Sequence, residues 1–215
     1  GFLGQNLCFF LAKNNFEIVA VGRGRAFAAA HFFETPFTYI NADLSKPELV
    51  AQLPLKKADL IFVMAGKTGT SAGFTAYTEY VASNEIALLN VLNEYRNQNA
   101  TARIVFPSSR LVYKGQKRKM LKEDDEKETK TIYAANKIAC ENYLYAFNNA
   151  FNIPYTIFRI CVPYGQLIPS KYSYGTLGFM LRQAQEKQNI ELFGDGAIYR
   201  TFTHVHDICS MMAEY

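Results

Sequence analysis

Short apolar runs rich in β-branched and aromatic residues alternate with segments of helical period along most of this chain. Such runs are typical of buried strands, and the periodic segments between several of them are typical of helices. A chain that repeats strand, helix and strand forms a parallel sheet covered by helices on both faces. The 215 residues, 49% of them hydrophobic, suffice for one substantial core. The expected strands are 16–22, 37–41, 58–66, 102–109 and 154–160.

The longest helical pattern is expected over 75–98, where the apolar residues Tyr80, Ile86, Leu89 and Leu92 suit one stripe. A second long helix is expected over 131–149. The composition shifts near 165–175, which marks a crossing into a smaller region. We therefore expect one region over 1–165 and a second over 166–215.

Composition and charge exclude several classes of protein. The net charge is +4, and no Lys/Arg block is dense enough to predict nucleic-acid binding. The most charged segment, 114–130, changes sign halfway and favours a solvated loop. No run approaches the roughly 18 apolar residues that predict a membrane span, and no signal peptide is visible.

The cysteines are far apart in the sequence and form no C-x-x-C pair. Each lies among apolar neighbours, which favours buried free thiols in a reducing cytoplasm over disulfides. The close pair His204 and His206 lacks further ligands in its own stretch, so no metal site is expected. The cysteines are Cys8, Cys140, Cys161 and Cys209.

Two glycines open the chain, Gly1 and Gly4, and precede an apolar helical run and then a strand ending at Gly22. This is the pattern of a dinucleotide-binding turn whose first glycine and first strand lie upstream. Glycines let backbone amides approach a pyrophosphate, and the helix N-terminus supplies partial positive charge. The alternative is a pair of glycines that serves only helix packing.

Tyr133 and Lys137 lie four residues apart at the start of the helix expected over 131–149. This spacing places both on one face, where a lysine can lower the pKa of a phenol. The spacing alone equally suits a solvated surface contact.

In their order along the chain, these motifs resemble the extended short-chain dehydrogenases/reductases of the NAD-dependent epimerase/dehydratase group, enzymes that remodel nucleotide sugars. The resemblance covers essentially all 215 residues and implies a Rossmann-type, doubly wound parallel sheet with part of a smaller C-terminal substrate-binding region. In that fold the first strand is central and would precede Gly1, and the substrate region would continue beyond Tyr215. The motifs are 1–4, Asp43 with Leu44, Ala65 with Gly66, Asn84, "PSSRLVYKG" at 107–115, Tyr133 with Lys137, "FRICVPYG" at 158–165 and "LFGDGAIYRTFTHVHDI" at 192–208.

The resemblance implies four catalytic residues. Tyr133 would be the acid/base, and Lys137 would lower its pKa. Ser109 would hold the reacting oxygen of the substrate by a hydrogen bond, and Asn84 would lie near Lys137. Ser109 could instead cap a turn, and Asn84 could be a helix residue bonded to backbone.

The implied cofactor is NADP or NAD. Where NAD-preferring relatives carry an acidic residue, this chain has Gly22 followed by Arg23. An arginine there can pair with a 2′-phosphate, which slightly favours NADP, unless it is only an exposed loop residue. The residues implied to hold the cofactor are Gly1, Phe2, Leu3, Gly4, Arg23, Asp43, Leu44, Ala65, Gly66, Tyr133 and Lys137.

The residues implied to contact a nucleotide sugar are Ser109, Arg110, Val162 and Arg200. Dehydratases of this group carry an Asp-Glu pair where this chain has Arg110 and Leu111, so a dehydratase is disfavoured. Val162 replaces a common asparagine, which leaves the sugar undetermined. Arg200 suits a diphosphate, although a surface salt bridge is its alternative role.

The sequence thus predicts a nucleotide-sugar epimerase that transiently oxidises a sugar hydroxyl. The alternatives are an NADPH-dependent reductase of a keto-sugar nucleotide or another carbonyl, and a regulator that senses dinucleotide without catalysis. Relatives are commonly dimers, so a homodimer through 75–98 and 131–149 is a further expectation.

Overall fold

The computed structural model describes residues 1–27, 29–34, 37–115, 120–169, 175–191 and 199–214. Its α-helices are α1 (Phe2–Lys13), α2 (Pro47–Val50), α3 (Tyr77–Val81), α4 (Ala87–Asn97), α5 (Ile132–Phe151), α6 (Gly175–Gln185) and α7 (Val205–Ala213). Its strands are β1 (Val19–Gly22), β2 (Thr38–Asn41), β3 (Leu60–Phe62), β4 (Arg103–Ser109), β5 (Tyr155–Ile160), β6 (Val162–Tyr164) and β7 (Phe202–His204). A π-helical turn, η4 (Ala82–Ile86), lies between α3 and α4, and short 3-10 turns are η1 (Ala30–Phe32), η2 (Leu55–Lys57), η3 (Ala72–Phe74) and η5 (Arg110–Val112).

The chain divides into two compact units, each described by itself. The first comprises 1–20, 26–39 and 160–215, and the second comprises 21–25 and 40–159. All four residues predicted for catalysis belong to the second unit. The assignment of 1–165 to dinucleotide binding and of 166–215 to part of a substrate-binding region stays a prediction.

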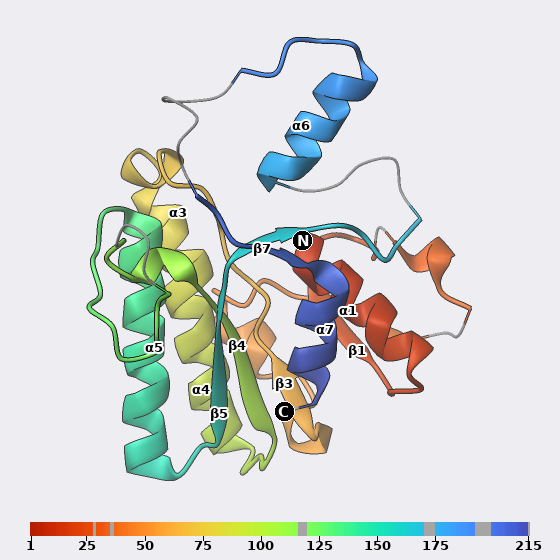
Figure 1. The fold of residues 1–215 in the computed structure, drawn as a ribbon. Helices are drawn as coiled ribbons and strands as arrows, with labels where there is room; N and C mark the ends of the chain where they lie inside the picture. The colour runs from red at the N-terminus through yellow and green to blue at the C-terminus, as the bar shows by residue number, and fades with distance from the viewer. Residues whose placement is uncertain (28, 35–36, 116–119, 170–174, 192–198, 215) are drawn as a thin grey trace. The chain divides into compact units, whose positions relative to one another are not determined.

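The second unit is built on a three-stranded sheet in the order β3-β4-β5. β3 and β4 run parallel, with Leu60 opposite Arg103 and Phe62 opposite Val105. Helices α4 and α5 lie side by side against one face of this sheet (Figure 1). In the core that the helices and the sheet share, the side chains of Leu88, Phe106 and Leu144 are almost completely buried. Each such side chain contributes about 1.5–3 kcal/mol through burial, so this core fixes the helices on the sheet.

Each of the five expected strands contains an observed one, β1 to β5. The described strands form three separate sheets, because β1 pairs only with β2 and β6 pairs in parallel with β7. The α/β class with parallel pairing is confirmed.

The helix expected over 75–98 is observed as α3, η4 and α4, from Tyr77 to Asn97. The stripe predicted on it was partly wrong, because Ile86 is 40% exposed and Leu88 takes the buried place. The π-helical turn explains this difference. It inserts one extra residue and so shifts the buried face for all residues that follow.

In the first unit, α1 packs against α7, and Leu7, Leu11, Val205 and Met212 are buried. The buried Asn6 side chain accepts a hydrogen bond from the Leu167 amide at 2.7 Å. The expected helix after Gly1 is thus confirmed as α1.

Four expectations from composition and motifs concern the charged segment, the cysteines, a membrane span and a metal site. Among the described residues of 114–130, most side chains are exposed, as expected of a solvated loop. All four cysteines are free, with Cys140 and Cys209 buried and the other two partly exposed. Among the residues that the structure describes, no helix combines the length and apolar character that a membrane crossing requires. The same residues contain no group of three or more His, Cys, Asp or Glu placed to hold a metal ion.

Candidate active site

The start of α5 positions the predicted tyrosine and lysine. Thr131 caps this helix, because its hydroxyl accepts a hydrogen bond from the Ala134 amide at 3.0 Å. Tyr133 and Lys137 therefore lie one turn apart on one face, with the Lys137 Nζ atom 5.9 Å from the centre of the Tyr133 ring. Lys137 is only 5% exposed. The pair is therefore not a solvated surface contact.

The Lys137 ammonium is held against the end of β4. Its Nζ donates to the carbonyl of Pro107 at 2.6 Å and lies 4.4 Å from the centre of the Phe106 ring. Burial lowers the pKa of Lys137 to about 8, although Cys140 and Glu141 act to raise it. One of its three N–H donors is used on Pro107, and an ammonium offers further donors for a ligand or for Tyr133.

Ser109 ends β4 and has the capping role that was its alternative interpretation. Its Oγ accepts a hydrogen bond from the Leu111 amide at 3.2 Å, at the start of η5. A hydroxyl that accepts one bond still carries a hydrogen to donate, so capping does not prevent substrate binding. Ser109 is 8% exposed, and Arg110, the first residue of η5, is half-buried.

Asn84 lies in the π-helical turn and is 3% exposed. Its Nδ2 atom donates to the Lys67 carbonyl at 3.3 Å and to Asn136 Oδ1 at 3.4 Å. Asn136 is the neighbour of Lys137, so Asn84 links the loop after β3 to α5. The Oδ1 atom of Asn84 is buried and finds no hydrogen-bond partner among the described residues. Such an acceptor is suited to a water or ligand hydroxyl.

Gly66 brings the loop after β3 close to Asn84. Its φ is +155°, and a Cβ built on it would clash with Asn84 Oδ1. The loop is also held by Tyr80, whose hydroxyl donates to the Thr68 carbonyl at 2.6 Å. A bare backbone, an unused buried acceptor and a buried ammonium form a donor and acceptor set that fits a dinucleotide.

Gly66→Ala should lower the free energy of unfolding by about 1–3 kcal/mol, because the new methyl group meets Asn84 and φ becomes strained. Asn84 cannot withdraw without losing its bonds to Lys67 and Asn136. Denaturant unfolding measures the change. Gly115→Ala is the matched control, because a Cβ there meets nothing within 4 Å. Equal unfolding curves for the two variants would contradict the close approach.

Asp43 and Leu44 follow β2, and both are held locally. Asp43 Oδ1 accepts bonds from the Ser45 amide at 3.0 Å and the Ser45 hydroxyl at 2.8 Å, which lower the pKa of Asp43. The Leu44 carbonyl accepts from Asn90 Nδ2 at 2.9 Å. Arg23, just after β1, also lowers the pKa values of Asp43 and Glu79 through its charge. The charge of Arg23 thus acts on the loop that follows β2 and on α3.

The other predicted residues belong to the first unit, so their approach to Tyr133 stays a prediction. Gly1 precedes the first turn of α1, which Phe2, Leu3 and Gly4 form. Val162 begins β6, opposite Phe202. Arg200 is exposed, and its guanidinium donates to the Tyr199 carbonyl at 3.2 Å.

One buried residue beside the pair had no predicted role. Glu141, on α5, is 4% exposed and pairs with Arg159 of β5 at 2.8 Å. Its sequence signal was its position four residues after Lys137, directly after the apolar residues 138–140. That signal is weak, because a glutamate in a helix is normally solvated.

The model of the NAD dependent epimerase/dehydratase family matches residues 1–214. The chain belongs to this family. The membership identifies it as an enzyme of the NAD-dependent epimerase/dehydratase type with a Rossmann-type fold, and it confirms the resemblance seen in the sequence.

Several known proteins are similar to this chain over 80% or more of its length. An uncharacterized UDP-glucose epimerase of Bacillus subtilis is 25% identical over 96% of this chain and 67% of its own length. The CDP-paratose 2-epimerase of Salmonella typhi is 22% identical, over 98% and 70%. A protein of Methanocaldococcus jannaschii is 26% identical, over 80% of this chain and 52% of its own length. The chain thus spans between about half and 70% of these relatives.

Solved structures show the same fold. The UDP-N-acetylglucosamine 4-epimerase of Methanobrevibacter ruminantium has a TM-score of 0.85 at 23% identity, over 99% of this chain and 69% of its own. The UDP-glucose 4-epimerase of Thermus thermophilus, solved with NAD, has a TM-score of 0.83 at 18% identity, over 100% and 71%.

Proposed function

We propose that the protein is a nucleotide-sugar epimerase that inverts one sugar carbon by transient oxidation. The observation that carries this proposal is the buried ammonium of Lys137, one turn from Tyr133 and bonded to the strand that ends in Ser109. The family is that of epimerases and dehydratases, and similar members are epimerases of UDP and CDP sugars.

In the proposed reaction Tyr133 is the proton acceptor. The positive charge of Lys137 favours the phenolate, which takes the proton of the sugar hydroxyl while Ser109 holds that oxygen. When bound, the dinucleotide would supply a reversible hydride acceptor for the same carbon. Tyr133 then gives its proton back to the oxygen, so that protons and electrons balance over the cycle. The product is the epimer.

Two residues support epimerisation over dehydration. Loss of water across two carbons requires an additional acid and base. This chain has Arg110 and Leu111 where dehydratases of the group have Asp and Glu. Neither residue can fill both roles at neutral pH, because an arginine stays protonated and a leucine has no titratable group.

The nucleotide diphosphate and the sugar are proposed to contact Arg200 and Val162. A guanidinium suits a diphosphate through paired, charge-assisted hydrogen bonds. The hydrophobic Val162, in place of the asparagine common in the group, leaves one polar contact to the sugar unmade. This favours a sugar with an apolar or small group at that position.

A homodimer through the helical segment 77–97 and α5 is also proposed. These helices expose apolar side chains, including Ile86 at 40% and Phe151 at 46%. Exposed apolar positions on two neighbouring helices are suited to a four-helix interface.

The test of the function is incubation of the intact protein with a panel of UDP, CDP and dTDP sugars. We expect a 4-epimer or other single-carbon epimer in the product, detected by NMR, without net consumption of nicotinamide cofactor. The reductase, which Arg23 favours through NADPH, would instead consume cofactor in proportion to product. Conversion of no sugar in the panel, with cofactor bound, would contradict the epimerase.

Arg23→Ser should weaken binding of NADP by about tenfold or more and leave NAD binding unchanged, because one charge-assisted bond is worth about 1.5–3 kcal/mol. Titration of the protein with each dinucleotide, followed by fluorescence or calorimetry, gives both dissociation constants. NAD is the internal control, since it lacks the 2′-phosphate. Equal losses for both dinucleotides, or tighter binding of NAD by the wild type, would count against NADP.

A further inference from the structure

The side chain of Glu141 is a buried carboxylate that contacts β4, β5 and the loop before α5. Its Oε1 atom accepts from the Ser108 hydroxyl at 2.6 Å and from Arg159 Nε at 2.9 Å. Its Oε2 atom accepts from Arg159 Nη2 at 2.8 Å and lies 3.4 Å from the Lys127 ammonium. Burial alone would raise the pKa of Glu141, but the hydrogen bonds from Arg159 and Ser108 outweigh it and lower the pKa. The carboxylate is therefore ionised at neutral pH.

Arg159 extends this network into the segment that follows η5. Its Nη1 atom donates to the Tyr113 hydroxyl at 2.8 Å and to the Glu123 carbonyl at 2.7 Å. Its guanidinium lies 4.9 Å from the centre of the Tyr113 ring. One carboxylate on α5 thus joins the ends of β4 and β5 to the loop after Ser109.

The contacts between α5 and β4 follow a register. Lys137 donates to the Pro107 carbonyl, and one helical turn later Glu141 accepts from Ser108. Two successive residues of β4 are therefore fixed by two side chains on one face of α5. Ser109 is the next residue, and Tyr133 lies one turn before Lys137 on the same face.

A gain in stability does not explain why the ion pair of Glu141 and Arg159 is buried. Removing two charges from water costs several kcal/mol each, and well-packed apolar residues often replace a buried ion pair without loss of stability. Apolar residues cannot reproduce the orientation that the pair imposes. The two hydrogen bonds from Arg159 and the one from Ser108 fix the angles of Glu141 as well as its distances.

We propose that Glu141, held by its ion pair with Arg159, is a positioning residue. It fixes the end of β4 and thereby places Ser109 against Tyr133 and Lys137. The proposal rests on the function proposed for those residues. A misplacement of about 1 Å between a substrate-holding group and an acid/base can lower the rate about a hundredfold. Glu141 acts through Ser109, and it need not touch the substrate.

The test uses the intact protein and three variants. Glu141→Leu/Arg159→Met replaces both charges by apolar groups of similar size, so no lone charge is left buried. Ser108→Ala removes one bond to the carboxylate and keeps the ion pair. Tyr95→Phe is the matched control, because Tyr95 donates a buried hydrogen bond from α4 to the Ala102 carbonyl, just before the opposite end of β4.

We expect the double variant to melt close to the wild type and to lose about 10- to 100-fold in kcat, with KM for the sugar nucleotide nearly unchanged. Ser108→Ala should lose less, and Tyr95→Phe should keep its kcat. Amide hydrogen exchange over 107–113 should accelerate in the double variant and not in Tyr95→Phe, since the Leu111 amide is bonded to Ser109.

A folded double variant with the wild-type kcat, or with unchanged exchange over 107–113, would overturn the proposal. If the double variant does not fold, the kcat of Ser108→Ala and its hydrogen exchange over 107–113 test the proposal instead. A wild type that converts no sugar would count against the proposed function instead, and hydrogen exchange would then decide the positioning by itself.

Discussion

Tyr133→Phe should lower turnover by about 10²- to 10⁴-fold, the usual contribution of a positioned acid/base. The variant keeps the ring and loses only the hydroxyl. The neighbouring Lys137 and the Thr131 cap do not depend on that hydroxyl, so the helix should keep its position. Dinucleotide binding should therefore change little, and the loss should appear in kcat rather than in KM.

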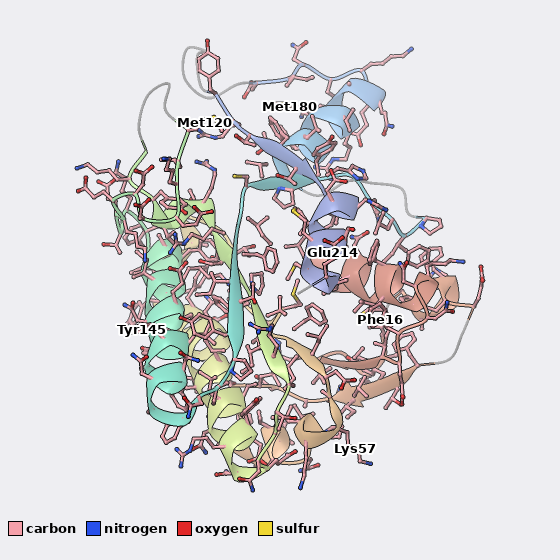
Figure 2. The ribbon with its side chains drawn as sticks, turned by 60° about the horizontal axis from the view of Figure 1, so that its bottom comes forward. Phe16, Lys57, Met120, Tyr145, Met180 and Glu214 are labelled. Atoms are coloured by element: carbon pink, nitrogen blue, oxygen red, sulfur yellow. The ribbon has the colours of Figure 1, made fainter. Side chains whose placement is uncertain are left out.

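The control for Tyr133→Phe is Tyr145→Phe. Tyr145 lies on the outer side of the same helix and is 61% exposed (Figure 2). It should keep full turnover. Steady-state kinetics with the sugar nucleotide and a binding titration with the dinucleotide complete the comparison. Unchanged biological activity of Tyr133→Phe, with dinucleotide still bound, would instead support the regulator that senses dinucleotide without catalysis.

Lys137→Met should lower turnover by about 10²-fold or more, because the phenol of Tyr133 loses the neighbouring charge that favours its ionised form. It also removes the bond to the Pro107 carbonyl, which anchors the end of β4. Lys130→Met is the control, because Lys130 is a solvated lysine whose side chain is 74% exposed and paired with Glu128. Turnover of the Lys137 variant at the wild-type rate would remove the lysine from the proposed mechanism.

The same variant should change the pH dependence of stability. Burial lowers the pKa of Lys137 from 10.5 to about 8 in the folded protein. Between these values the unfolded chain binds more protons than the folded one, so the free energy of unfolding rises with pH. Denaturant unfolding should show this rise in the wild type, by about 3 kcal/mol from pH 8 to 10.5 relative to Lys137→Met. Parallel curves for the two proteins would show that Lys137 keeps its ordinary pKa.

Local pattern was sufficient for the elements and for the pair at the start of α5. Alternation of apolar runs predicted the five strands that the structure describes within the first 160 residues. Burial selects β-branched and aromatic side chains wherever a parallel sheet is covered on both faces. The interval between Tyr133 and Lys137 predicted their shared face, because helical geometry is a property of neighbouring residues.

Helical periodicity in the sequence led to a wrong prediction where one extra residue in a turn rotates the buried face of the helix. The expected stripe placed Ile86 in the core, but the π-helical turn that carries Asn84 shifts the face, and Leu88 is buried instead. That turn is stabilised by the contacts of Asn84 with Lys67 and Asn136, which lie 17 and 52 residues away in the sequence. No periodicity within the helix encodes such contacts.

The sequence by itself determined the order of strands and helices, the family to which the chain belongs, and the tyrosine and lysine that begin α5. Only the tertiary structure decided that Lys137 is buried against Pro107 and that Glu141 joins α5 to Ser108 and Arg159. It also decided that Asn84 Oδ1 is buried beside Gly66 with no hydrogen-bond partner among the described residues. The physical reason is the range of the interactions. Backbone geometry and burial patterns are set by adjacent residues, whereas the desolvation and pairing of a charge depend on groups that only folding brings together.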